Sequence, residues 1–433
     1  MESLISRNDE SLLPVAAQAV RPLAAPEPQK PVGGLFFTLY GFASFGLSLV
    51  VMMPALFSLP YKVGLLAPDD KVAVLGLVAT VGAVVGLIAG PVAGVLSDRT
   101  RTAIGRRPPW LISGIIVLAA GSILVALSSS VTMLIIGWII VSLGGAASSA
   151  AIIPIVAERV PEAQRGTVGA AVGVATQLAG VLGYSIGGLL TANLLLLFLA
   201  PVLALALFGG AFMIVLREPI VELPRTTVVA AFRGLTFNPR HYPDFSVVWI
   251  GKLLMQIALA FLATYQLYFV IDRLGFTAQE AGGTLAIVGG TGIVVAMAFA
   301  IVSGILSDRI KRRKPFIIGS AVLAVAGLGL LAFTDGFWLF FASVLFIVGS
   351  AGMFGSVDIA LASDLVPERE HAGRWMSIYN LAATLSTAIA PLLGAALLGV
   401  SSLNSTNYTA LFLGGAVLAL GTGVGVTFVR SVR

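Results

Sequence analysis

A short phrase occurs twice in this chain of 433 residues, and this duplication constrains the fold more than any other feature. The first copy is Gly94-Val-Leu-Ser-Asp98-Arg99, followed by a basic run that ends in Gly105-Arg106-Arg107-Pro108. The second copy is Gly304-Ile-Leu-Ser-Asp308-Arg309, followed by Lys311-Arg312-Arg313-Lys314-Pro315. The two aspartates are 210 residues apart, and each phrase lies between long apolar stretches. A period of half the chain predicts two structural halves built alike, an internal symmetry typical of secondary transporters.

The composition indicates a membrane protein. Hydrophobic residues make up 58% of the chain and charged residues only 11%, against about 25% charged residues in an average soluble domain. The 49 glycines suit close packing between membrane helices, whereas glycine weakens helices in water. This composition excludes a soluble globular protein, because so much apolar surface could not be kept out of water.

Apolar windows of roughly 20 residues, the length that crosses about 30 Å of hydrocarbon, predict twelve spans. They are 33–58, 71–97, 109–129, 131–157, 165–190, 194–216, 245–271, 281–306, 315–334, 336–361, 372–399 and 407–429. We therefore expect an all-α membrane protein with two pseudo-symmetric six-helix bundles, 33–216 and 245–429. Residues 1–32 are predicted to be a disordered cytoplasmic N-tail, 217–244 a cytoplasmic linker and 430–433 a C-tail.

The distribution of basic residues predicts the orientation. With the N-terminus inside, the predicted cytoplasmic segments hold 22 of the 26 Lys and Arg residues, and the external loops hold Lys62, Lys71 and Arg273. Both termini are therefore expected in the cytoplasm, in the plasma membrane of a bacterium. The net charge of +6 then reflects topology and contact with anionic lipid, so no nucleic acid partner is expected. Because the chain has no cysteine, thiolate metal sites are excluded, and we expect neither a metal nor a cofactor.

A second phrase repeats in matching positions. Glu158-Arg-Val-Pro161-Glu162 and Arg165 follow the fourth predicted span, and Asp364-Leu-Val-Pro367-Glu368 and Arg374 follow the tenth. Together the two repeated phrases resemble the loop signatures of the major facilitator superfamily. The resemblance implies the twelve-helix major facilitator fold and transport by alternating access. The longer spacing of the segment from Ser97 to Pro108 resembles the sucrose-transporter and glycoside–pentoside–hexuronide symporter branches, although the span carboxylates of their sodium-coupled members are missing here.

The repeated aspartates are predicted to form an inner gate. Asp98 ends the second span on the side where the eleventh span begins near Arg374, and Asp308 has the same relation to the start of the fifth span. A carboxylate beside a helix N-terminus gains about 0.3–1 kcal/mol. Such contacts between the halves could hold the cytoplasmic side shut in one state and release it in the other. The alternative is that these charges serve topology only.

Two charged residues are predicted to lie inside the membrane. Asp358 is the only carboxylate within a predicted span, and a carboxyl group buried in a membrane can exchange protons. It is our candidate for proton coupling, with a purely structural carboxylate as the alternative. Lys252 is the only basic residue that lies well inside a predicted span, away from its ends. It either extends to the inner headgroups or pairs with Asp358, which lies at the same depth.

The candidate substrate-binding residues carry amides, hydroxyls and aromatic rings, which are the groups that a neutral sugar requires. Apart from Lys252, they are Tyr40, Ser44, Trp138, Gln177, Gln256, Tyr265, Gln266, Tyr268, Asn380 and Thr384. Membrane helices also use single hydroxyl residues for packing, so the set predicts a site only as a group.

The sequence thus predicts a transporter that imports a sugar or glycoside together with a proton. Three alternatives stay open: a proton-coupled antiporter that exports a drug or metabolite, a uniporter, and a transporter-like sensor. An enzyme is not expected, because the only histidines, His241 and His371, fall in loops and no nucleophile–base spacing is present.

Overall fold

The computed structural model describes residues 31–215, 236–400 and 406–429, and the regular secondary structure of these residues is entirely helical. Twelve helices are long and apolar enough to cross a membrane, which confirms the predicted number of spans. The predicted C-tail 430–433, most of the predicted N-tail 1–32 and most of the linker 217–244 lie outside the described residues.

The N-terminal half holds the first six spans. They are α1 (Gly34–Met53) continued by η3 (Pro54–Ser58) and α2 (Leu59–Leu66), α3 (Lys71–Arg99), α4 (Pro108–Leu127), α5 (Val131–Ile152) followed by the short α6 (Ile155–Arg159), α7 (Glu162–Leu189) and α8 (Leu194–Val215). The C-terminal half holds α10 (Pro243–Asp272), α11 (Ala278–Ile310), α12 (Lys314–Ala332), α13 (Phe337–Asp364), the 3-10 turn η4 (Arg369–His371), α14 (Ala372–Leu398) and α15 (Tyr408–Thr427).

The first span is longer than the sequence indicated. The predicted end at residue 58 is wrong, because the helix passes through the π-helical turn η3 and runs on to Leu66. Pro54 and Pro60 stand near the starts of η3 and α2 but inside the continuous helix, so each removes one backbone N–H donor from it. The wider π turn absorbs the local change in pitch, so prolines that would usually mark a helix end are tolerated here.

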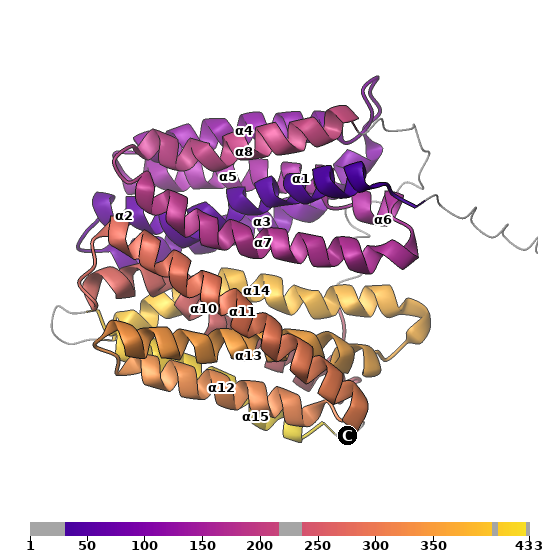
Figure 1. Cartoon of the computed structure of the whole chain (residues 1–433), viewed down its shortest axis with the longest axis vertical. Coiled ribbons are helices and arrows are strands. Elements are labelled where there is room, and N and C mark those ends of the chain that lie inside the picture. Colours follow the sequence, from indigo (N-terminus) through magenta and orange to yellow (C-terminus); the bar gives the residue numbers. More distant parts are fainter. Residues whose placement is uncertain (1–30, 216–235, 401–405, 430–433) are drawn as a thin grey trace, which may run out of the picture.

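The two halves pack their helices in the same pattern. The contacts α1·α7, α1·α8, α3·α5, α4·α5 and α4·α8 have the counterparts α10·α14, α10·α15, α11·α13, α12·α13 and α12·α15. Figure 1 shows the halves as two layers, with the N-terminal half above and the C-terminal half below. The internal repeat of the sequence is therefore also a repeat of the packing.

Glycines allow the closest of these contacts. A Cβ atom at Gly121 of α4 would lie 2.7 Å from the backbone nitrogen of Val141 of α5, and one at Gly327 of α12 would lie 2.8 Å from the carbonyl oxygen of Ser343 of α13. Both distances are shorter than real Cβ contacts. Glycine at these places lets helix backbones touch, which explains part of the high glycine content.

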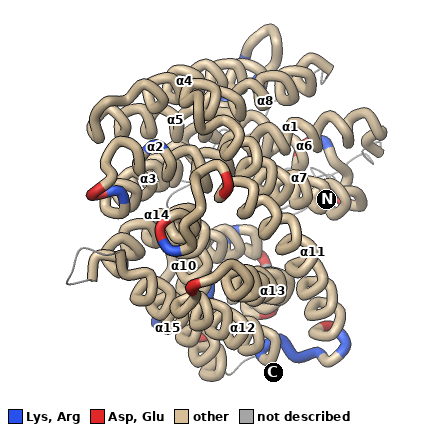
Figure 2. The backbone as a smooth tube through the Cα atoms, turned by 60° about the vertical axis from the view of Figure 1, so that its left-hand side comes forward, with Lys and Arg blue, Asp and Glu red and all other residues tan. Residues whose placement is uncertain are grey.

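The ends of the bundle differ in charge. We call the end with the loops 100–107 and 311–313 the basic end; the blue stretch beside the C-terminus in Figure 2 belongs to it. The other end carries the loops 67–70 and 273–277 and is called the opposite end. All twelve long helices run between these two ends.

Candidate transport pathway between the halves

Polar contacts join the two halves at the opposite end. The Lys71 ammonium of α3 lies 2.6 Å from a carboxylate oxygen of Asp272 in α10. The Tyr268 hydroxyl of α10 donates to the carbonyl of Pro60 in α2 at 2.8 Å. Because each contact bridges the halves, this end is closed.

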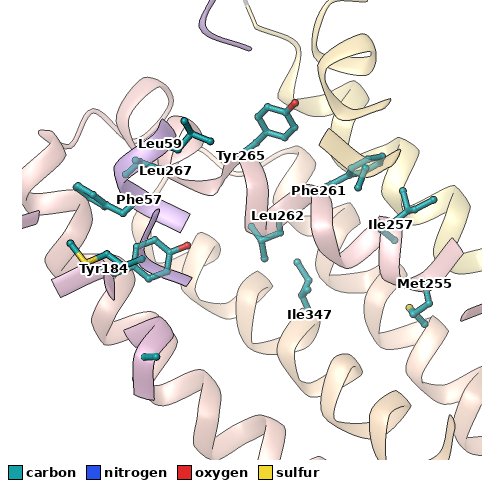
Figure 3. Packing of buried hydrophobic residues seen from close by; sticks show 14 of the residues in the cluster. Phe57, Leu59, Tyr184, Met255, Ile257, Phe261, Leu262, Tyr265, Leu267 and Ile347 are labelled. Carbon is teal, nitrogen blue, oxygen red and sulfur yellow. The ribbon is translucent and has the colours of Figure 1, made fainter. Parts of the chain in front are cut away.

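Buried side chains and backbone continue this closure. The amide of Gln266 in α10 donates to the Tyr184 hydroxyl in α7. Figure 3 shows Phe57, Leu59 and Tyr184 from the N-terminal half beside Leu267 from the C-terminal half, and all four are buried. The halves therefore share an apolar core at the opposite end.

Two helix pairs carry most of the contact between the halves: α3 with α14, and α7 with α11. In the first pair, the Thr80 hydroxyl donates to the carbonyl of Ala388 at 3.0 Å. In the second pair the backbones touch, because a Cβ atom at Gly282 would lie only 2.6 Å from the Cα of Gly188.

Toward the basic end the same helices separate. In Figure 1, α7 and α11 lie close at the left and diverge to the right, where the basic end lies. Thr384 and Asn380 stand one and two turns before Ala388, respectively, on the same face of α14, and both are exposed. Gln177, two turns before Tyr184 on α7, is exposed as well. The structure is thus closed at the opposite end and parted at the basic end, with amides and a hydroxyl on the parted faces.

The first copy of the repeated phrase forms a buried charge cluster within the N-terminal half. Arg107, only 1% exposed, donates to the Ser97 hydroxyl at 2.9 Å and to the carbonyl of Ala150 at 3.0 Å. Its guanidinium also contacts Asp98 at 2.8 Å and Glu158, and Arg106 lies 2.8 Å from Glu158. The cluster ties together the basic ends of α3, α4 and α5.

The second copy repeats this arrangement in the C-terminal half. Arg313 donates to the Ser307 hydroxyl at 3.0 Å, contacts Asp308, and lies 3.6 Å from Asp364. The Arg313 side chain is 21% exposed, so this cluster is wetter than its counterpart. Each residue of the second cluster occupies the pseudo-equivalent position of a residue in the first.

Among the described residues, the ion pairs of the two repeated aspartates at the basic end lie within one half rather than between the halves. Asp98 and Asp308 pair within their own halves, as described above. Of the basic residues predicted beside them, Arg374 donates to the carbonyl of Thr236 at 2.9 Å and Arg165 to that of Val160 at 3.1 Å. The latch between the halves therefore stays a prediction, for a conformation in which the basic ends of the two halves approach each other.

The remaining residues of the repeated phrases shape the loops. Gly105 has a φ of +102°, which a side chain would strain, and it turns the chain into α4. A Cβ atom added at Gly94 would meet nothing within 4 Å, and one added at Gly304 would meet only Ser356, at 3.9 Å. Arg99, Arg309 and Arg312 are among the arginines exposed at the basic end.

The two charges predicted inside the membrane form an ion pair. Lys252 of α10 lies 3.0 Å from a carboxylate oxygen of Asp358 of α13, and both side chains are buried. The ammonium stands 4.1 Å from the centre of the Tyr379 ring, whose hydroxyl donates to Asp358. It also lies 3.5 Å from the amide oxygen of the exposed Asn380. Of the two alternatives for Lys252, the structure shows the ion pair.

Tyr379 is the residue of this group that the sequence analysis did not select. Its ring and hydroxyl contact both charges, so it completes the pair. The signal was present, because Tyr379 precedes Asn380 within a predicted span at the depth of Asp358. Aromatic residues in spans most often serve packing, and the neighbouring charge was visible only in three dimensions.

Several candidate substrate-binding residues have other contacts here. Tyr40 and Ser44 are buried in the N-terminal half, where Tyr40 packs against Phe212. Trp138 lies against Gly82 of α3, within the same half. The Tyr265 hydroxyl donates to the carbonyl of Pro391 at 2.5 Å, so in this conformation its proton is already used in a hydrogen bond within the protein.

The predicted polar residues therefore lie in different parts of the structure. Gln177, Asn380 and Thr384 lie on the parted faces, and Asn380 adjoins the ion pair. Gln256 is half-buried on α10, one turn from Lys252. Gln266 and Tyr268 belong to the closed opposite end.

Two matched bundles of membrane helices, closed at one end and parted at the other around polar side chains, are the architecture of a solute transporter. Comparison with known families then gives the particular family. The model of the Major Facilitator Superfamily matches residues 34–300 and 293–433, so the chain belongs to this superfamily. Comparison with curated protein sequences gives no match.

Solved structures share the fold at low sequence identity. The nucleoside transporter NupG, in a mutant form, superposes with a TM-score of 0.72 at 13% identity over 91% of this chain and 98% of that chain. A bacterial homologue of the human lysosomal transporter Spinster, in an inward-facing and unoccupied conformation, gives 0.67 at 14% identity over 91% and 95%. A D-xylose-proton symporter gives 0.61 at 19% identity over 90% and 96%. Identities this low establish the fold only.

Proposed function

We propose that this transporter carries a small polar solute of the sugar or glycoside kind together with a proton, by alternating access. The observation that supports it is the asymmetry between the ends: contacts between the halves close the opposite end, while the parted faces present Gln177, Asn380 and Thr384. The excess of Lys and Arg in the loops of the basic end supports a cytoplasmic location for this end, and in that orientation the present conformation is open inward.

The proton is proposed to travel on Asp358. It is the single carboxylate within a predicted span, it is buried, and it faces the parted region through Lys252 and Asn380. A buried ion pair is stable only while both members are charged, so protonation of Asp358 changes the energy of this site strongly. Such a change can couple proton binding to solute binding.

Uptake by proteoliposomes tests this function. Radiolabelled sugars and glycosides are offered with and without an inward pH gradient, and we expect accumulation that depends on the gradient. Asp358→Asn should abolish uphill accumulation while exchange of solute continues. Asp335→Asn is the matched control, because Asp335 is exposed at the opposite end and should leave accumulation unchanged. Uptake without any effect of the gradient would instead identify a uniporter.

One observation favours proton-coupled export as a second candidate. Gly183-Tyr184-Ser-Ile-Gly187-Gly188 in α7 half-resembles a motif of drug antiporters, and Gly188 makes the backbone contact with Gly282 that seals the opposite end. An exporter would lower the accumulation of dyes in cells that produce the protein. The sugar proposal predicts no change in dye accumulation.

A further inference from the structure

The ion pair at Lys252 and Asp358 lies within a stretch of the C-terminal half that offers no other charge. α11 contains no titratable residue between Ala281 and Ser307. From α12 and α15, the residues lining the small cavity beside the pair are Ile317, Thr422 and Val426. Of the described residues that contact the pair, only Tyr379 of α14 is titratable, and its hydroxyl already serves Asp358. Among the described residues, no second carboxylate is therefore at hand for Lys252.

Because no second carboxylate among the described residues is near, protonation of Asp358 leaves the charge of Lys252 unbalanced. The carboxylate loses its charge and Lys252 keeps its own, so a buried cation remains without a counter-charge. An unpaired buried charge is strongly unfavourable, whereas a pair of opposite charges with hydrogen bonds is tolerated. Either Lys252 then loses its proton, or an anion from outside the protein replaces the carboxylate.

The geometry gives an anion a route to the ammonium. The Lys252 ammonium contacts both Asp358 and Asn380, and the Asn380 side chain is exposed on the parted face of α14. Thr384 continues this face one turn further, and Gln177 stands on the facing half. An anion that reaches Lys252 past Asn380 would thus pass amides and a hydroxyl that bind hydroxyl groups.

From these contacts we infer that the solute is a small hydroxylated organic anion with one carboxylate, which binds Lys252 when Asp358 is protonated. This inference rests on the proposed function and specifies its substrate. One proton from solvent binds an Asp358 oxygen, and one carboxylate of the solute takes its place beside Lys252. The loaded site has the same net charge as the empty ion pair, so transport is electroneutral. Release of the proton restores the Lys252–Asp358 pair and expels the anion.

Matched solutes test the charge requirement on the purified full-length protein. The probes are four acid–neutral pairs: gluconate with glucitol, galacturonate with galactose, glycerate with glycerol, and lactate with 1,2-propanediol. Thermal stabilisation is measured at about pH 5 and about pH 8, which bracket much of the range open to a buried carboxyl group. We expect an acid to stabilise the protein where its neutral partner does not. Its affinity should fall by up to about tenfold per pH unit, because one proton is bound with each anion.

Variants assign the effect to the ion pair. Asp358→Asn should bind the acid at both pH values with equal affinity, since its side chain is neutral throughout. Lys252→Met with Asp358→Asn keeps the site neutral and should bind no acid, while Lys252→Arg should retain binding. Lys62→Met is the matched control: Lys62 is equally buried, at 6%, but lies at the opposite end on the carbonyl of Ala126, and its loss should leave the anion response unchanged.

Each outcome supports or overturns the anion inference. Equal or better stabilisation by a neutral partner, or stabilisation by none of the acids, overturns the anion inference. If such a neutral solute is also accumulated with the pH gradient in proteoliposomes, the proposed transport function stands alone. If no member of any pair is bound or carried, both the inference and the proposed solute class fail.

Discussion

Gly282→Ala should shift the transporter toward the conformation that is open at the opposite end. The added methyl group would lie 2.6 Å from the Cα of Gly188 and 2.7 Å from the carbonyl oxygen of Tyr184, whereas ordinary contact begins at 3.4 Å. α7 and α11 must therefore move apart by about 0.8 Å to accept it, the difference between 3.4 and 2.6 Å. Overpacking of this kind costs about 1–3 kcal/mol, and only in the state that makes the contact. The equilibrium should shift by about 5- to 150-fold.

Gly283→Ala is the control for helix propensity. Alanine strengthens a helix by about 1 kcal/mol relative to glycine, but it does so equally in both conformations, so this effect cancels. A Cβ atom at Gly283 meets nothing within 4 Å. The neighbouring substitution should therefore leave the conformational equilibrium unchanged.

Spin labels measure the shift directly. The chain has no cysteine, so Leu65→Cys and Phe333→Cys, both exposed at the opposite end but in different halves, can be labelled without removing native thiols. Pulsed electron spin resonance should show a larger population at long distance in Gly282→Ala than in the parent. An equal shift in Gly283→Ala, or no shift in Gly282→Ala, would refute the argument that the backbone contact closes this end.

Two further predictions use the charged contacts. Lys71→Met removes the ion pair with Asp272 between the halves. Because partly exposed pairs contribute up to about 1 kcal/mol, the population open at the opposite end should rise by up to about fivefold in the spin-label assay. Arg273→Met, which removes a pair within one half, should leave that population unchanged. Arg107→Met should lower the thermal unfolding temperature more than Arg313→Met, because the first guanidinium is 1% exposed and the second 21%, and a matching or reversed order would contradict the different burial of the two clusters.

The duplicated loop phrases made the fold predictable. Asp98 and Asp308, with the basic runs that follow them, gave the period, and hydropathy gave the number of spans. Helices in a membrane must satisfy their backbone hydrogen bonds internally, so length and composition suffice to place them. The exception was the end of the first span, which was predicted at residue 58, whereas the helix continues through the π-helical turn to Leu66.

The sites were less predictable, because a side chain's role depends on which helix faces it. Trp375 lies near the start of a predicted span, where tryptophan typically marks the membrane interface, yet it is 1% exposed and packs against Tyr242 and Phe245. Tyr265 reads as a sugar-binding residue in the sequence, but its hydroxyl bonds a backbone carbonyl. A backbone acceptor leaves no trace in residue identity, so no pattern in the sequence distinguishes these uses.

Asp98→Asn should act on the equilibrium in the opposite direction from Gly282→Ala. In the present state the Asp98 side chain is 39% exposed and shares Arg107 with Glu158, so its loss leaves the arginine paired and costs little. In the other state the proposed latch would place Asp98 at the N-terminus of α14. Loss of that contact should disfavour the other state by about 0.3–1 kcal/mol, or about two- to fivefold.

The double variant makes this reasoning testable. The two sites lie at opposite ends of helices roughly 40 Å long, so their effects should add, and Asp98→Asn should partly reverse the shift caused by Gly282→Ala. Spin labels at Ile104→Cys and Ile310→Cys, exposed at the basic end in different halves, report the population that is closed there. If Asp98→Asn raised this population or left it unchanged in the Gly282→Ala background, Asp98 would not be a latch between the halves. The presence of an aspartate in both copies of the phrase would then be explained by the charge cluster of each half alone.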